Sequence, residues 1–135
     1  MFKKIISMFF AFLIFGVSFS NAAEKKVIEG FDSPESIASD GKYVYVSNMG
    51  KELKATAKDG DGTISRLSLA GEVLDKQFLP EKGMLHSPKG IAIVGHVLYV
   101  ADVDHLIGFD LKTRQQVMDI DFSSEKTLFL NDVAV

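Results

Sequence analysis

A stretch of sixteen residues occurs twice in this chain, and it limits the possible folds more than any other feature. Residues 33–48 read SPESIASDGKYVYVSN, and residues 87–102, which begin 54 positions later, read SPKGIAIVGHVLYVAD. Seven of the sixteen aligned pairs are identical, and the alignment needs no gap. A third copy begins with LNDVAV at residues 130–135. Self-similarity with a period of roughly 20–50 residues is typical of solenoids and propellers.

Each copy predicts a series of short strands separated by turns. In the first copy, aromatic and β-branched residues at 43–46 indicate a strand, and further strands are predicted at 63–69 and 73–79. In the second copy the predicted strands cover residues 90–94, 97–102, 106–111 and 117–122. Beyond residue 23, no window has convincing helical periodicity. Four short antiparallel strands per repeat are typical of a β-propeller blade, so we expect an all-β propeller.

The length of the repeat supports this interpretation and locates an insertion. Ile91 and Val133 are 42 residues apart, a usual blade length, whereas Ile37 and Ile91 are 54 apart. The twelve additional residues fall at about 50–61, GKELKATAKDGD, between the second and third strands. This insertion is either a functional loop or a solvated connection. We predict blade one at about 33–80, blade two at about 87–123, and the start of blade three at 129–135.

Residues 1–23 have the pattern of a signal peptide. Lys3 and Lys4 precede an apolar run at 5–19, and small residues follow at 20–23. A retained membrane anchor is the alternative, because about twenty apolar residues can span a bilayer. Without any cysteine the chain is not a lipid-anchored lipoprotein. We expect cleavage, and a domain over residues 24–135 that is periplasmic or secreted and does not contact the membrane.

The charge balance excludes one class of partner. Two of the fifteen basic residues and none of the eighteen acidic residues lie in the leader, so the formal net charge changes from −3 to −5 on cleavage. The remaining chain has no basic stripe, which argues against nucleic-acid binding. It also lacks the sequence patterns of a phosphate loop, a Ser-His-Asp triad and a Cys/His zinc site.

Strand direction predicts where a ligand would bind. In antiparallel strands, the start of each first strand and the end of each second strand lie at the same end of the sheet. Propellers usually bind ligands on this face. The residues that we predict to bind a small-molecule ligand there are Asn48, His86, Asp102, Asp104 and Asp132. The remaining histidines, His96 and His105, are expected on the surface.

Two acidic motifs have both a functional and a structural interpretation. Residues 59–62, DGDG, resemble the start of a calcium loop, but an EF-hand would need Gly at Ile64 and Glu at Ala70, so a polar turn is favoured. Asp102 and Asp104 could supply hard oxygen ligands to calcium or magnesium. Aspartate at the end of a strand is equally common as a turn residue.

The motif S-P-x-x-I-A, followed by G-x-x-x-Y-V and later by L-N-D-V-A-V, resembles the SMP-30/gluconolactonase/LRE-like family and the related NHL-type repeats. Those proteins are six-bladed β-propellers. In the lactonase members a divalent cation, usually calcium or zinc, lies at the channel mouth. The resemblance implies that Asp32, in D-S-P where the family has E-S-P, and Asn131 are metal ligands. It also implies that Asp132 lies beside the substrate.

The resemblance leaves two functional classes open, and it implies that this is an N-terminal fragment of a propeller. One class is a metal-dependent hydrolase of lactones or related esters, whose catalytic residues we do not assign. The other is a non-enzymatic exported propeller that binds a ligand or a protein. The chain covers about two blades and the first strand of a third. We therefore expect either C-terminal blades of a longer protein, carrying the remaining ligands, or a ring of several copies.

Overall fold

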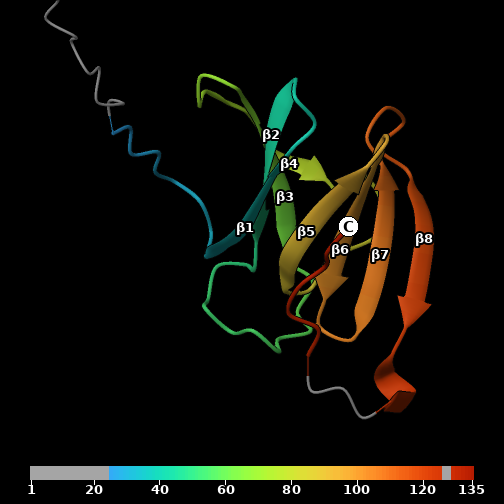
Figure 1. The fold of residues 1–135 in the computed structure, drawn as a ribbon. Helices are drawn as coiled ribbons and strands as arrows, with labels where there is room; N and C mark the ends of the chain where they lie inside the picture. The colour runs from blue at the N-terminus through green and yellow to red at the C-terminus, as the bar shows by residue number, and fades with distance from the viewer. Residues whose placement is uncertain (1–24, 126–128) are drawn as a thin grey trace, which may run out of the picture.

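Two four-stranded antiparallel sheets form the protein in the computed structural model, which describes residues 25–125 and 129–135. The predicted signal peptide lies outside the described residues. In each sheet the strands follow one another in chain order (Figure 1). The first sheet contains β1 (Pro34–Ser39), β2 (Tyr43–Asn48), β3 (Thr63–Ser68) and β4 (Val73–Leu79). The second contains β5 (Pro88–Val94), β6 (Val97–Asp102), β7 (His105–Asp110) and β8 (Gln116–Asp121), followed by a 3-10 turn, η1 (Ser123–Glu125).

The prediction of an all-β fold is confirmed, and the predicted strands agree closely with those observed. β4 and β6 have the predicted limits, whereas β2 continues to Asn48 and β5 begins two residues earlier than expected, at Pro88. No strand forms at residues 129–135, where the repeat predicts one. A strand needs a continuous ladder with a neighbour, and this segment makes two backbone hydrogen bonds with the second sheet, from Leu130 N to Val103 O and from Gly90 N to Asn131 O.

The strand registers reproduce the sequence repeat. The β1–β2 ladder pairs Ile37 with Val46, and the β5–β6 ladder pairs Ile91 with Val100, as the offset of 54 residues requires. Each ladder has an irregularity directly after its first proline. Two segments with the same sequence pattern therefore have the same local geometry, bulge included.

Asp40 and Gly41 close the β1–β2 turn. The Asp40 carboxylate accepts hydrogen bonds from the backbone N–H groups of Lys42 (2.8 Å) and Tyr43 (2.7 Å). Gly41 has a φ of 82°, a conformation that is costly for residues with a β-carbon. These hydrogen bonds and the conformation of Gly41 form a tight turn, which fixes the pairing of β1 with β2.

The hydrophobic core lies between the two sheets, where β1 and β2 contact β5. Its buried side chains are Tyr45, Ile64, Phe78, Leu79, Leu85, Ile91, Leu98, Val100, Ile107 and Phe109. The repeat predicts that the equivalent residues Ile37, Ile91, Val46 and Val100 are buried between blades. Val46 is buried, although on the other face of the first sheet, and Tyr99 is half-buried. The core thus joins one face of each sheet.

The prediction that Ile37 is buried is wrong. Its side chain is 68% exposed, whereas that of its repeat equivalent Ile91 is 6% exposed. The face that carries Ile91 packs against the first sheet. The equivalent face of the first sheet has no second sheet beside it among the described residues. The shallow apolar hollow around Ile37 is lined by residues of the first sheet and, from the segment before β1, by Ile28 and Phe31.

The insertion at residues 50–61 is folded against the second sheet and runs along the lower end of the molecule in Figure 1. Lys89 Nζ donates a hydrogen bond to the carbonyl oxygen of Ala55 (2.8 Å), and Ser87 Oγ donates one to that of Lys54 (3.1 Å). These contacts show that the insertion packs on the protein and is more than a solvated connection.

The two sheets do not close on each other, so the propeller architecture remains a prediction. A search for a membrane-crossing helix, one both long and apolar enough, finds none in the described part of the chain.

Candidate functional site

The predicted site residues lie near the end of the molecule where β1 and β5 begin and where β2 and β6 end. The register places Pro34 opposite Asn48, and Pro88 opposite Asp102. The insertion runs along the same end (Figure 1).

Asp102 is fully engaged in local structure. Its two carboxylate oxygens accept hydrogen bonds from the backbone N–H groups of His86 (2.8 Å) and Ser87 (2.7 Å), and its side chain is buried. These charge-assisted bonds fix the start of β5. The His86 ring is half-buried, and its Nδ1 atom is buried without a hydrogen-bond partner among the described residues.

Asn48 occupies the equivalent position in the first sheet and is bonded differently. Its Nδ2 atom donates to Ser65 Oγ (2.9 Å) and to the carbonyl oxygen of Val46 (3.2 Å). Its Oδ1 atom has no partner within the described chain, although the residue is only 2% exposed. A buried acceptor without a partner is costly, so this atom marks a place where a donor is missing.

A polar cleft of about 320 Å³ opens beside Asn48. Its lining residues are Gly30, Phe31, Asp32, Asn48, Thr63, Ser65, Asp75, Lys76 and Gln77. Asp32 is exposed at its rim, and its carboxylate makes no hydrogen bond or ion pair within the described residues. The cleft therefore brings the predicted metal ligand Asp32 together with the predicted ligand-binding residue Asn48.

Asp104 forms an ion pair with the insertion. Lys58 Nζ donates to Asp104 Oδ2 at 2.6 Å, and this hydrogen bond lowers the pKa of Asp104 although burial opposes the change. The second oxygen, Oδ1, is buried without a hydrogen-bond partner in the described region. Asp104 thus holds the insertion against the second sheet.

His105, next in the chain, lies among carboxylates. Its Nδ1 atom is 2.7 Å from Asp119 Oδ1, and its Nε2 atom is within 4 Å of Asp104 and Asp121. The hydrogen bond with Asp119 raises the pKa of His105, and the three carboxylate charges add to this effect against a smaller contribution from burial. The cluster lies where β7 begins and β8 ends.

Glu35 interacts electrostatically with both Lys89 and Asp132. Lys89 is 1% exposed, and its Nζ atom donates to the carbonyl oxygens of Ala55 and Ser87, each at 2.8 Å. Burial lowers the pKa of Lys89. Partial burial raises the pKa of Glu35, and the charge of Asp132 adds to this effect. Glu35 and Lys89 are repeat equivalents. Because they also act on each other electrostatically, the starts of β1 and β5 lie near each other.

The segment with Asn131 and Asp132 packs closely on β5. The backbone N–H of Gly90 donates to the carbonyl oxygen of Asn131 (2.9 Å). A β-carbon on Gly90 would lie 2.3 Å from Asp132 Oδ1, so only glycine fits at this position. Asn131 is exposed, and its hydrogen bond with Gly90 involves its backbone carbonyl oxygen and not its side chain.

The structure brings some of the predicted residues together. Asp32 lies with Asn48 in the cleft, and Asp132 packs on Gly90 of the second sheet and acts electrostatically on Glu35 of the first. Asp32 and Asn131 are not brought into contact, and the described residues contain no group of three or more His, Cys, Asp or Glu side chains placed to hold a metal ion. Since calcium takes six to eight oxygen ligands, Asp32 and Asn131 alone do not make a site for it.

Sequence reasoning missed the role of two lysines. Lys58 and Lys89 connect the insertion to the second sheet, but surface exposure is the usual environment of lysine and no spacing rule marks these two. For Lys89 a signal was available, because it aligns with Glu35 at the start of the repeat and so belongs to the predicted binding face.

Comparisons with protein-family models, with curated proteins and with solved structures found no match to this chain.

Proposed function

We propose that the chain forms two consecutive blades of an exported β-propeller, similar to the SMP-30/gluconolactonase/LRE-like proteins, that binds a small molecule in the cleft beside Asp32 and Asn48. Two features support the propeller interpretation. The strand pairs of the two sheets are related by the same offset of 54 residues as the two sequence copies. The two sheets also pack face to face through the hydrophobic core. Stacking of four-stranded sheets is the packing of propeller blades.

One observation carries the proposal of a binding site. In the second sheet, the Asp102 oxygens are satisfied by two backbone N–H groups. At the equivalent place in the first sheet, the Asn48 carbonyl oxygen has no partner in the described chain, and a cleft opens beside it. At this position of the repeat, the side-chain oxygens are therefore hydrogen-bonded in the second sheet, whereas in the first sheet one side-chain oxygen remains unbonded beside a cleft.

The residues of the cleft indicate the chemistry of the ligand. Asn48 Oδ1 and the Asp32 carboxylate are hydrogen-bond acceptors without a partner among the described residues, and hydroxyl groups of Thr63 and Ser65 lie in the same lining. Lys76 Nζ already donates to the carbonyl oxygen of Gly30 (2.9 Å). A ligand with several hydroxyl groups complements such a lining, because each hydroxyl can donate to one acceptor.

Metal-dependent hydrolysis of a lactone or ester is the second candidate, favoured by the unpartnered Asp32 carboxylate. Calcium or zinc would polarise the carbonyl group of such a substrate. The described residues supply too few ligands for this ion, so this candidate requires further ligands from outside them. A titration with calcium and zinc of the full-length protein that carries those further ligands, beside its Asp32→Ala and Asn131→Ala variants, tests it. Absence of binding to the parent, or equal binding by all three proteins, contradicts the metal site.

The proposed cleft can be tested by calorimetry with glucose and glucono-1,5-lactone as probes. We expect binding by the parent protein, and a loss of about tenfold or more in affinity in Asp32→Ala and Asn48→Ala, because each removes an acceptor oxygen. Asp59→Ala is the matched control, because it removes a carboxylate from the exposed insertion, away from the cleft. If neither probe binds to the parent, or if the two cleft variants bind as well as the control, the proposal is wrong.

A further inference from the structure

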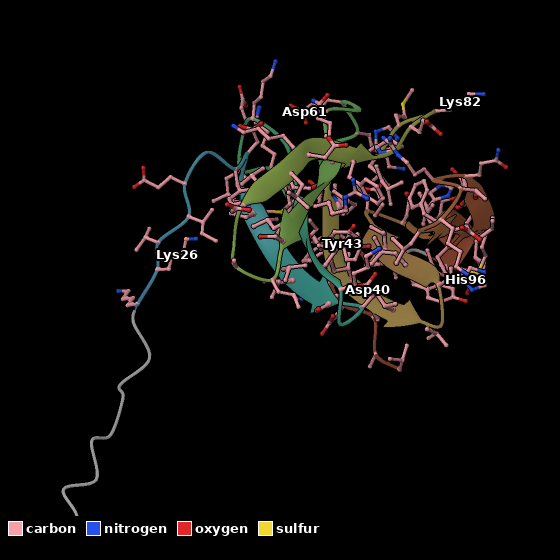
Figure 2. The ribbon with its side chains drawn as sticks, turned by 90° about the horizontal axis from the view of Figure 1, so that it is seen from above. Lys26, Asp40, Tyr43, Asp61, Lys82 and His96 are labelled. Carbon is pink, nitrogen blue, oxygen red and sulfur yellow. The ribbon has the colours of Figure 1, made fainter. Side chains whose placement is uncertain are left out.

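A second cleft lies between the two sheets at the other end of the molecule, where the β1–β2, β5–β6 and β7–β8 turns meet. Its volume is about 480 Å³. Its lining residues are Asp40, Lys42, Tyr43, Tyr45, Arg66, Gly95, His96, Leu111 and Lys112. Figure 2 shows Asp40, Tyr43 and His96 on this side of the molecule, whereas Asp61 of the insertion lies apart from them. We call this the Arg66 cleft.

Arg66 is held between aromatic rings, and its charge is not neutralised. Its guanidinium carbon lies 4.2 Å from the centroid of the Phe78 ring and 4.9 Å from that of Tyr43. Within the described residues, its buried Nε atom has no hydrogen-bond partner, and no Asp or Glu forms an ion pair with it. Stacking orders the planar group and leaves its N–H donors available.

Arg114, the second arginine of the sequence, shows what a satisfied guanidinium looks like in the same core. It also stacks on Phe78, at 4.9 Å from the ring centroid. Its Nε and Nη2 atoms, however, both donate to the carbonyl oxygen of Phe78, at 3.0 Å and 2.7 Å. Arg114 therefore has a structural role, whereas Arg66 has the same packing with unused donors.

The charges around Arg66 favour an anion. Lys42 and Lys112 add positive charge, whereas His96 is paired with the Asp110 carboxylate (3.2 Å) and adds no surplus charge. The Asp40 carboxylate is the one acidic group in the lining, and it is engaged by two backbone N–H groups and by the Tyr45 hydroxyl group (3.0 Å). The cleft is thus locally cationic in a chain whose formal net charge is −3.

We propose that the Arg66 cleft binds the oxyanion group, carboxylate or phosphate, of a small ligand. The guanidinium presents a rigid fork of donors that matches either group in a bidentate manner. Lys42 and Lys112 supply the additional charge. The ring of Tyr43, which packs against Arg66, offers an aromatic wall for the remainder of the ligand. This site is independent of the cleft beside Asn48, and it requires no metal ion.

Nuclear magnetic resonance provides a direct test, because the chain has two arginines and hence two Nε–Hε signals. The purified protein is titrated in separate arms with inorganic phosphate, citrate, and sodium chloride at matched ionic strength. We expect phosphate or citrate to shift the Arg66 signal progressively to saturation, and the Arg114 signal to stay in place. The arm with the tighter binding assigns the class of oxyanion.

Substitutions distinguish the contribution of the Arg66 guanidinium geometry from that of the positive charge. Arg66→Lys keeps the charge but loses the fork, and we expect calorimetry with phosphate or citrate to show about tenfold weaker binding or more than in the parent. Lys42→Ala removes one exposed charge at the rim and should weaken binding by about two- to fivefold without affecting the fold. Arg114→Lys should bind as the parent does, with its remaining Arg66 signal still responding.

Three results would overturn the proposal: no shift of the Arg66 signal with phosphate or citrate, equal shifts of both arginine signals, or an equal shift with sodium chloride. If Arg66→Lys does not fold, the Lys42→Ala titration and the parent spectra still decide the question. The parent must then show a selective Arg66 response, and Lys42→Ala must weaken it.

Discussion

Ile37 and Ile91 provide a matched pair for testing how the repeats pack. They occupy the same position in the two copies, and each pairs with a valine across its ladder. Ile91 is buried between the sheets, whereas Ile37 lies on the outer face of the first sheet. The same substitution at both positions therefore changes the same atoms in two environments.

The expected magnitudes follow from burial. Replacing a buried isoleucine by alanine costs about 2–5 kcal/mol, and the tight surroundings of Ile91 favour about 3 kcal/mol. For Ile37→Ala we expect about 0.5–1 kcal/mol, because an exposed site loses little apart from β-propensity. With a urea m-value of about 1.5 kcal/mol/M, the midpoint should fall by about 2 M for Ile91→Ala and by about 0.5 M for Ile37→Ala.

Urea unfolding, followed by circular dichroism, measures both variants beside the parent protein. If Ile91→Ala is too unstable to fold, Ile91→Val and Ile37→Val give the same comparison on a smaller scale, with about 0.5–1.5 kcal/mol expected for Ile91. Equal shifts for the two positions would refute the assignment of faces. They would mean that the outer face of the first sheet is covered in solution.

Further predictions concern the carboxylates and the leader. Asp102→Asn should destabilise the protein by about 1.5–3 kcal/mol in urea unfolding, because one charge-assisted bond to a backbone N–H is lost; an unchanged midpoint would contradict this. The raised pKa of His105 means that its contacts stabilise the fold below its unfolded-state pKa, and that this contribution is lost as the pH rises through the folded-state value. The difference in midpoint between about pH 5 and pH 8 should therefore shrink in His105→Gln; an undiminished difference would count against the role of His105. N-terminal sequencing of exported protein should begin at Ala23 or Glu24, and an intact Met1 would disprove cleavage.

The strands could be predicted from the sequence because the repeat gives two independent views of the same element. Turn residues such as Asp40 and Gly41 mark the strand ends, and the alternating pattern at residues 43–46 appears again in the second copy. A local pattern that occurs twice is a stronger guide than either copy alone.

The burial of Ile37 could not be predicted in this way. The repeat specifies which side of a strand is apolar, but whether another sheet covers that side depends on the rest of the assembly. Ile37 and Ile91 have the same local pattern, and only tertiary packing distinguishes them.

The hydrogen-bond and ion-pair partners of the site residues could not be predicted from the sequence either. Asp102 and Asp104 looked alike as candidates, yet one binds backbone N–H groups and the other binds Lys58, which is 46 positions earlier. An ion pair over this distance along the chain depends on how the insertion folds, and composition does not specify its path.

The distribution of satisfied and unsatisfied groups is a better guide to function than the positions of acidic residues. Near the strand starts, Asp102 is committed to the backbone and Asp104 pairs through one oxygen with the insertion, so they contribute first to structure. Among the described residues, four buried side-chain atoms have no hydrogen-bond partner: Asn48 Oδ1, Arg66 Nε, His86 Nδ1 and Asp104 Oδ1. Two of them belong to residues that line a cleft, Asn48 in one cleft and Arg66 in the other. One is an acceptor and the other a donor. Ligands for the two clefts should therefore differ in chemistry, and hydroxyl-rich probes should not compete with phosphate or citrate for binding.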